Sequence, residues 1–198
     1  MIFTKMTLED VFVIEPDRRE DDRGFFTRAW CRNEFDASGV HFRPVQANLA
    51  FTKKRGTLRG LHYQVAPHQE IKLVRCVKGA IFDVIIDLRK ESRTHLQWLS
   101  VELTSDNGKA LLVPEGFAHG YQTLRDGTEV LYQVSQFYHP ESERGVRWND
   151  PAFAIKWPKS DNPILSDKDK NWPDYICSIS SDPIAKNEFH GQPTFLGA

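Results

Sequence analysis

Two histidines are the clearest candidates for chemistry in this chain. His62 lies in the segment RGLHYQ (residues 59–64), and His119 lies in PEGFAHG (residues 114–120). Each follows a glycine, a residue that lets the backbone approach a neighbour or a ligand closely. Segments with the alternation of β-strands run between them, so one small barrel would bring both imidazoles to a single site. Such a site would either hold a metal or move a proton.

Strands are the elements that must position these histidines. Turn signals such as Lys78-Gly79 and Asp126-Gly127 separate short segments rich in β-branched residues, a spacing typical of a sandwich or barrel. One helix is predicted, over Asn33–Ser38. The predicted strands are Gln46–Phe51, Thr57–Gln64, Ile71–Val77, Ala80–Leu88, Gln97–Leu103, Ala110–Val113, His119–Leu124 and Glu129–Tyr138. The fold class predicted from this pattern is mainly β, with few short helices.

Composition limits the partners. The 198 residues are 40% hydrophobic and 27% charged, with a net charge of −1, so no strong field attracts nucleic acid or an anionic membrane. No apolar run reaches the length of a membrane span, and the N-terminus lacks a signal-peptide core. Three widely spaced cysteines fit a reducing, cytoplasmic compartment. We expect one domain over residues 1–198, with 158–198 as a tail packed on the barrel.

The spacing around the two histidines resembles the skeleton of the two cupin motifs. Metal-binding cupins carry a second histidine two residues after the first, and here Gln64 stands at that position. A metal needs three or four good donors aimed at one point. His62, His119 and Glu70 remain, and an amide oxygen is a poor replacement for an imidazole. We therefore expect no metal and no cofactor. The residues alone also allow two histidines that are merely hydrogen-bonded at a barrel mouth.

Six segments in order resemble the dTDP-4-dehydrorhamnose 3,5-epimerase family. They are DDRGFF (21–26), LRGLHYQ (58–64), KLVRCVKGAIFDVIIDLRKES (72–92), VPEGFAHGYQTL (113–124), YQVSQFYHPESERGVRWNDP (132–151) and LSDKD (165–169). The resemblance implies a cupin-type jelly-roll β barrel, a homodimer, and no catalytic metal. It also implies a substrate in which a nucleotide diphosphate carries a 4-keto-6-deoxyhexose, as in dTDP-rhamnose biosynthesis.

Epimerisation of such a sugar makes chemical sense of four residues. A ketone at C4 acidifies the C–H bonds at C3 and C5, so the reaction needs a base, a group that stabilises the enolate, and an acid on the opposite face. His62 is the candidate base, because an unperturbed imidazole titrates at about pH 6.5 and so suits a proton acceptor near neutral pH. The resemblance assigns Asp169 as the carboxylate that orients it, Lys72 as the cation at the enolate oxygen, and Tyr132 as the acid.

The resemblance also implies the residues that bind the substrate. Arg59 and Lys168 would hold the diphosphate together with Gln46 and Asn48, and His119 would support the site. Tyr138 would stack on the base, and it shares its strand parity with Tyr132. The full set of binding residues is Arg23, Phe26, Arg28, Gln46, Asn48, Arg59, His119, Tyr138, Glu143 and Lys168, with Arg23 and Phe26 supplied by the partner subunit.

Two positions complicate this assignment. Strict alternation places Arg59 and His62 on opposite faces of their strand, so both reach one pocket only if the strand bulges near Gly60 or if Arg59 lies at its mouth. Arg28 stands where the family usually has a glutamate. Because this reverses the charge at a nucleoside contact, the nucleotide and its sugar stay open, as does the choice between C3, C5 or both.

Two other functions stay open at this point. One is a metal-dependent cupin oxygenase or isomerase, for which stoichiometric metal and inhibition by a chelator would be evidence. The other is a cupin that binds a sugar nucleotide without catalysis. A separate acid and base argue against the second, because binding alone needs neither.

Overall fold

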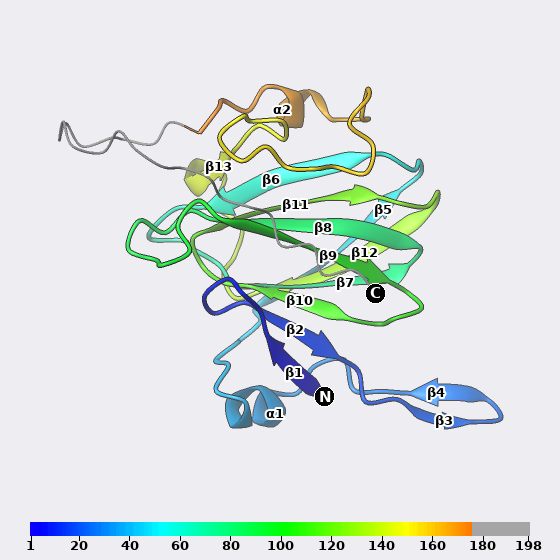
Figure 1. Ribbon diagram of the computed structural model, residues 1–198. Coiled ribbons are helices and arrows are strands. Elements are labelled where there is room, and N and C mark those ends of the chain that lie inside the picture. Colours follow the sequence, from blue (N-terminus) through cyan, green and yellow to red (C-terminus); the bar gives the residue numbers. More distant parts are fainter. Residues whose placement is uncertain (176–198) are drawn as a thin grey trace.

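Two antiparallel sheets face each other in the computed structural model, which describes residues 1–175 (Figure 1). The six-stranded sheet has the order β1-β2-β10-β7-β12-β5, and the five-stranded sheet has the order β13-β6-β11-β8-β9. In the first sheet the strands are β1 (Ile2–Lys5), β2 (Phe12–Glu15), β10 (Ala110–Val113), β7 (Lys72–Lys78), β12 (Thr128–Val134) and β5 (Gln46–Thr52). In the second they are β13 (Glu143–Gly145), β6 (Leu58–Gln64), β11 (Phe117–Thr123), β8 (Ala80–Asp87) and β9 (Trp98–Thr104).

This is the expected mainly β, cupin-type fold, and the eight predicted strands are confirmed. The predicted helix is also present, as α1 (Arg32–Ala37). The expected strand Glu129–Tyr138 was wrong at its end, because β12 stops at Val134 and Tyr138 lies in the following loop. The prediction missed β1, β2, β13, the hairpin of β3 (Arg19–Asp21) and β4 (Gly24–Phe26), and helix α2 (Asp167–Lys170), which are too short to show a clear period.

Strand β8 is buried on both faces, which explains its nearly continuous apolar sequence. Ile81 and Ile85 pack between the sheets with residues such as Leu111. Val84 and Ile86 belong to a second cluster on the outer face of the five-stranded sheet. The two aspartates of this strand are therefore fully buried as well, and each of them has a cationic or imidazole partner.

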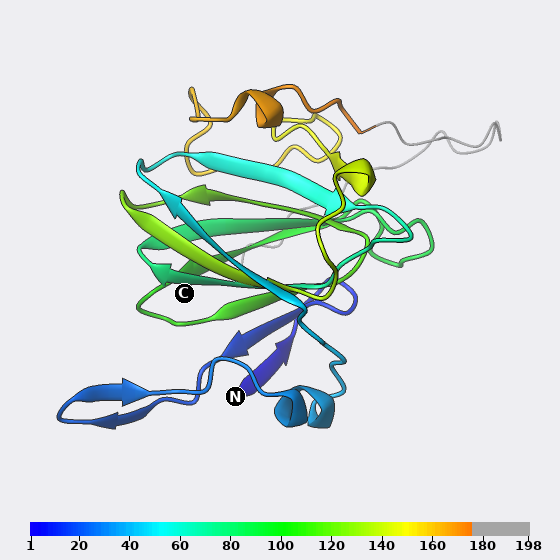
Figure 2. The same cartoon turned by 180° about the vertical axis from the view of Figure 1, so that it is seen from behind.

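Residues 158–175 lie over that outer face. Trp157 is buried in the second cluster with Phe153, and Leu165 and Tyr175 pack against it. Ile164 forms a parallel bridge with Thr57 beside β6. Figure 2 shows this segment and α2 lying along β6. The tail predicted over 158–198 is described as far as residue 175, and the rest of it, with Cys177, lies outside the described residues.

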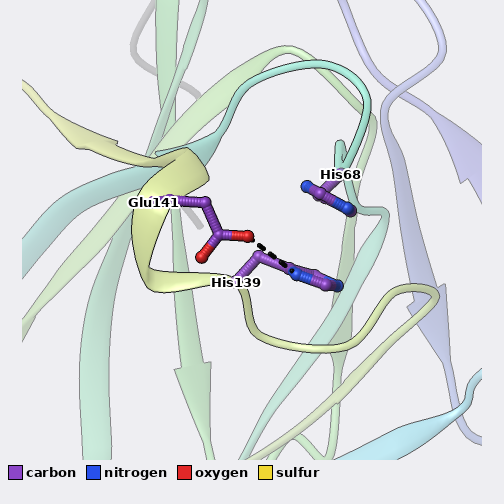
Figure 3. A group of neighbouring side chains, drawn as sticks. All are labelled: His68, His139 and Glu141. Atoms are coloured by element: carbon purple, nitrogen blue, oxygen red, sulfur yellow. Dashed lines mark hydrogen bonds and ion pairs between the residues drawn. The ribbon is translucent and has the colours of Figure 1, made fainter.

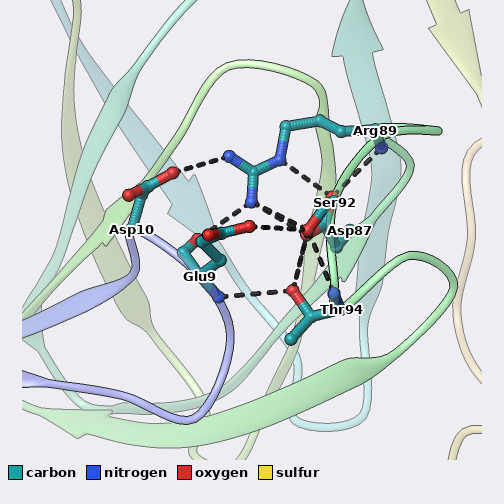
Figure 4. Close-up of polar contacts among 6 residues, drawn as sticks. All are labelled: Glu9, Asp10, Asp87, Arg89, Ser92 and Thr94. Carbon is teal, nitrogen blue, oxygen red and sulfur yellow. Dashed lines mark hydrogen bonds and ion pairs between the residues drawn. The ribbon is translucent and has the colours of Figure 1, made fainter.

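A polar network ties the N-terminal segment to the loop after β8 (Figure 4). Arg89 donates to Asp87 at 2.8 Å and to Asp10 at 2.8 Å. Ser92 and Thr94 donate to the same Asp87 carboxylate at 2.6 and 2.7 Å. Burial alone would raise the pKa of Asp87, but these hydrogen bonds outweigh it and lower that pKa. The network therefore joins the turn before β2 to the loop between β8 and β9.

The described part of the chain contains no helix that is long and apolar enough to span a membrane. The hairpin β3–β4 extends away from both sheets (Figure 1).

Candidate active site

Two adjoining cavities of about 410 and 400 Å³ are lined by strands of both sheets and by the segment around α2. They share four residues, His62, Lys72, Tyr132 and Lys168. The first cavity also contains Gln46, Asn48, Tyr138 and Glu143, and the second contains Arg59, His119 and Asp169. The structure thus brings together all the candidate site residues except Arg23, Phe26 and Arg28.

The pairing of β6 with β11 places the two histidines side by side. His62 and His119 are direct cross-strand partners, whereas the next partner pair is Arg59 with Tyr121. Three residues of β6 therefore match two of β11, which is a bulge. Because the bulge shifts the alternation by one residue, Arg59 and His62 line the same cavity. This is the bulge near Gly60 that the sequence left as one of two possibilities.

Gly60 is needed at this bulge for a backbone contact. Its φ is +117°, and a Cβ there would lie 2.5 Å from the Cα of Gly120 on β11. No other residue type tolerates that combination of dihedral and contact. The glycine therefore lets two strands approach each other, rather than a strand and a ligand.

His62 pairs with a carboxylate from the distant end of the described chain. Its Nε2 lies 2.6 Å from Oδ1 of Asp169, which is buried. Ser166 caps α2 by accepting from the Asp169 backbone N–H, so this short helix fixes the carboxylate. Burial alone would raise the pKa of Asp169, but the hydrogen bond with His62 helps to lower it. An ionised carboxylate only accepts, so Nε2 carries the proton and Nδ1 is left as the basic nitrogen.

Trp172 holds the imidazole from another side. Its ring meets the His62 ring edge-on, with centroids 5.8 Å apart. The indole lies against Gly145, where a Cβ would come within 2.2 Å of it, and Gly145 is the cross-strand partner of His62 on β13. His62 is therefore fixed in orientation by a carboxylate and by an aromatic ring.

His119 has its own carboxylate. Its Nε2 lies 2.8 Å from Oδ1 of Asp83 on β8, and both residues are buried. The other oxygen, Oδ2 of Asp83, is buried with no hydrogen-bond partner in the structure. The site therefore contains two imidazole–carboxylate pairs on neighbouring strands.

The six-stranded sheet supplies the opposite wall. Lys72, Val74 and Cys76 alternate inward on β7, and Val130, Tyr132 and Val134 do so on the neighbouring β12. Lys72 is thus a cavity residue and not a solvated strand lysine, with its Nζ 3.1 Å from Oε1 of Glu70. Burial and the charge of Glu70 raise the pKa of Tyr132, which keeps this phenol protonated at neutral pH.

A cluster of charges surrounds the mouth of the first cavity. Lys168 contacts Glu143 at 2.5 Å, and the Tyr138 hydroxyl donates to the same carboxylate at 2.7 Å. Gln46 donates to Asn48 at 3.0 Å on β5. Arg59 donates to Thr52 at 3.1 Å at the edge of the second cavity. These groups offer cations and amides to an anionic ligand.

Three predicted binding residues lie elsewhere in this subunit. Arg23 is 89% exposed and pairs with Asp21, and Phe26 is 70% exposed, both on the projecting hairpin β3–β4. Arg28 follows the hairpin and pairs with Glu34 at 2.6 Å. Within one subunit they do not reach the cavities.

The donors near His62 do not form a metal site. Gln64 uses its amide for the backbone, since it donates to the carbonyls of His68 and Phe137 and accepts from His139 N–H. Asp169 and Asp83 each hold one histidine, and Glu70 holds Lys72. The ligand atoms of His62, His119 and Glu70 do not all lie within 4.8 Å of one another, so these three donors are not aimed at one point.

Across residues 1–175, one group of three or more His, Cys, Asp or Glu residues has all its ligand atoms within 4.8 Å of one another, and it consists of His68, His139 and Glu141 (Figure 3). The two imidazoles are stacked, with centroids 3.5 Å apart and an angle of 12° between their planes. Imidazole binds a metal in its ring plane, and two nearly parallel planes do not meet within bonding distance. The trio is therefore arranged as a stack and not as a set of ligands.

Sequence reasoning assigned no role to Asp83 and Tyr121. Tyr121 lines the second cavity, and burial raises its pKa to about 12. Asp83 could have been found from the sequence, because it is a charged residue inside the mostly apolar strand β8. Tyr121 gives no such signal, because strand tyrosines usually pack.

Comparisons with known proteins identify the family of this chain. The sequence model of the dTDP-4-dehydrorhamnose 3,5-epimerase family matches residues 5–176. The chain is 40% identical over 179 residues to the dTDP-4-dehydrorhamnose 3,5-epimerase of Sinorhizobium fredii, covering 90% of this chain and 91% of that one. It is 38% identical over 165 residues to the dTDP-4-dehydrorhamnose 3-epimerase of Streptomyces niveus, covering 83% and 79%.

A solved structure extends the agreement to three dimensions. The dTDP-4-dehydrorhamnose 3,5-epimerase of Bacillus anthracis, with TDP and PPi bound, superposes with a TM-score of 0.86 at 43% identity. The alignment covers 88% of this chain and 99% of that one. This chain therefore belongs to the dTDP-4-dehydrorhamnose 3,5-epimerase family and is an isomerase of the epimerase class.

Proposed function

We propose that this epimerase inverts carbons next to the ketone of a dTDP-linked 4-keto-6-deoxyhexose, using His62 as base and Tyr132 as acid. The observation that carries the proposal is their placement. His62 comes from the five-stranded sheet and Tyr132 from the six-stranded sheet, and both line the same cavities. A ring held between the sheets is exposed to the two groups from opposite sides, as inversion requires.

In the first step, Nδ1 of His62 accepts the proton from C3 or C5. The electrons of that C–H bond form a C=C bond to C4, and the ketone becomes an enolate. Asp169 stabilises the imidazolium, and the Lys72 ammonium stabilises the enolate oxygen. The phenol of Tyr132 then gives a proton to the other face of the same carbon. Exchange with solvent returns the proton to the tyrosine and removes it from the histidine.

The cations at the cavity edges supply the diphosphate site. Arg59 lines the second cavity, and Lys168 lines both cavities. Lys168 is already paired with Glu143, so a diphosphate would replace or share that contact. In this proposal Tyr138, which is exposed and donates to the same glutamate, stacks on the nucleotide base.

We further propose a homodimer in which the hairpin β3–β4 of a second copy completes the nucleoside site. Phe25 and Phe26 are exposed on that hairpin, and Leu49 and Phe51 are exposed on the edge strand β5. Large apolar side chains on a projecting hairpin and on a sheet edge are typical of an interface. Arg23 and Arg28 would then reach the nucleotide of the partner subunit.

A reducing, cytoplasmic compartment fits the free cysteines Cys31 and Cys76, and we propose it as the protein's location.

The function is tested by incubating the protein with a set of nucleotide-linked 4-keto-6-deoxyhexoses in heavy water and locating deuterium by NMR. We expect deuterium at C3, C5 or both of the dTDP-linked sugar. Tight binding without exchange would indicate a non-catalytic cupin. Exchange that a chelator abolishes and added metal restores would indicate a metal-dependent enzyme.

A further inference from the structure

Glu70 is a charged side chain of the cavity that the mechanism above does not use. It lies two residues before Lys72, the first residue of β7, and lines the first cavity with Lys72 and Tyr132. Its side chain is 11% exposed, and that of Lys72 is 12% exposed. A carboxylate this buried beside a reacting ketone is costly unless it has a task, because it opposes the negative charge of an enolate.

The backbone on both sides of Glu70 is fixed. Ile71 donates its N–H to Oγ of Ser135 at 2.8 Å, and its carbonyl accepts from the Ser135 N–H at 3.0 Å. On the other side, the carbonyl of His68 accepts from the Gln64 amide. The Glu70 carboxylate is therefore held at the cavity wall.

The position of Glu70 relative to Lys72 lets their side chains form an ion pair. Residues two apart on an extended chain point to the same side, and here Oε1 and Nζ lie 3.1 Å apart. In residues 1–175, Glu70 is the ion-pair partner of Lys72. We propose that Glu70 is a positioning residue of the epimerisation, which holds the Lys72 ammonium at the cavity wall and places a negative charge at the cavity that Tyr132 also lines. The proposal rests on the proposed function.

The charges around Tyr132 decide how Glu70 affects the pKa of that phenol. Burial raises the pKa of Tyr132 most, Glu70 raises it further, and Arg59 lowers it. The other titratable groups that line the cavities are His62 and Tyr63 on β6, Lys72 on β7, His119 and Tyr121 on β11, Glu143 on β13, Tyr138 in the loop before it, and Lys168 and Asp169 on α2. Glu70 thus opposes the cations that would otherwise favour the phenolate. A tyrosine that must donate a proton benefits from this.

Two substitutions separate position from charge. Glu70→Gln keeps an oxygen that accepts from Lys72 but removes the negative charge, whereas Glu70→Ala removes both. We expect Glu70→Ala to lower kcat about ten-fold with little change in KM, and Glu70→Gln to restore most of kcat. In Glu70→Gln the alkaline limb of the pH–kcat profile moves to lower pH, because the phenol loses a negative neighbour.

The matched control is Glu129→Gln. Glu129 pairs with Lys78 at 3.3 Å on the same two strands, β12 and β7, but does not line the cavities. It should change neither kcat nor the alkaline limb. An alkaline limb that stays in place in Glu70→Gln, or that moves equally in Glu129→Gln, would overturn the proposal.

A second readout does not depend on turnover. Ultraviolet difference titration of wild type against Tyr132→Phe gives the pKa of the Tyr132 phenol. The same titration of Glu70→Gln against the double variant Glu70→Gln, Tyr132→Phe shows how that pKa changes without the Glu70 charge. A lower pKa in that background supports the proposal, and an unchanged pKa overturns it. Since this measurement needs no substrate, failure of the inference is distinguishable from failure of the proposed function, which is judged on wild-type exchange alone.

Discussion

Asp87 and the carboxylates of the cavities are the same chemical group in two different surroundings, one enclosed by protein donors and the other beside open space. Asp87 is fully buried and accepts from Arg89, Ser92 and Thr94 (Figure 4). At the first cavity, Glu70 pairs with Lys72 beside open space, and Glu143 there pairs with Lys168 and accepts from Tyr138. Where protein groups saturate a charge, the charge stabilises the fold. Where donors and acceptors are left facing a cavity, they are available to a ligand and to a reaction.

The largest expected effect is on the reactive side of this comparison. His62→Ala removes the base, and we expect solvent deuterium incorporation into the 4-keto sugar to fall about 10³-fold. Nucleotide binding should stay close to wild type, since the diphosphate contacts come from other residues. NMR of the sugar measures the exchange, and calorimetry with dTDP measures the binding. Undiminished exchange would remove His62 from the base role.

The opposite pattern is expected at Asp87. Asp87→Ala leaves Arg89 without its buried partner, so the free energy of unfolding should fall by about 3 kcal/mol. Exchange per folded molecule should not change, because Asp87 lines neither cavity. Urea unfolding and the deuterium assay measure the two quantities.

The control for that substitution is Arg125→Ala. Arg125 pairs with Asp106 at 3.1 Å, and both side chains are more than half exposed. Its removal should cost less than about 1 kcal/mol. If Asp87→Ala and Arg125→Ala lowered the free energy of unfolding equally, the hydrogen bonds to the buried Asp87 would contribute no more stability than an exposed ion pair.

Tyr132→Phe sharpens the comparison within the site. Removing the acid should slow net inversion about 10²-fold, while deuterium exchange with retained configuration persists through His62. Product NMR in heavy water distinguishes inversion from retention. Full inversion by this variant would show that another group returns the proton.

The smallest effect is a pH dependence of stability. The folded-state pKa of Asp87 is lowered, so its ionised form stabilises the fold. This contribution is complete above the ordinary aspartate pKa of about 3.9 and is lost as the pH falls from there through the lowered pKa. The stability difference between wild type and Asp87→Asn should therefore shrink on acidification. A difference that grows towards low pH would contradict the assigned direction.

Much of this architecture could be predicted from local patterns. β-Branched segments divided by glycine turns gave the central strands, and the histidine spacing gave two neighbouring imidazoles. The strands β1, β2, β3, β4 and β13, each of three or four residues, were missed because they are too short to show a period, although the equally short β10 was predicted. Tyr138 was placed in a strand that ends at Val134, because nothing in the apolar pattern marked the stop.

The sequence alone determined the class of the fold, the chemical type of the site and the family resemblance, because these depend on residue types and short spacings. The tertiary structure decided which groups meet. Asp169 reaches His62 across 107 residues of chain, Glu70 reaches Lys72 inside a cavity, and a bulge at Gly60 places Arg59 beside His62. These contacts depend on strand register and on the path of the tail, which are fixed only when the two sheets pack together.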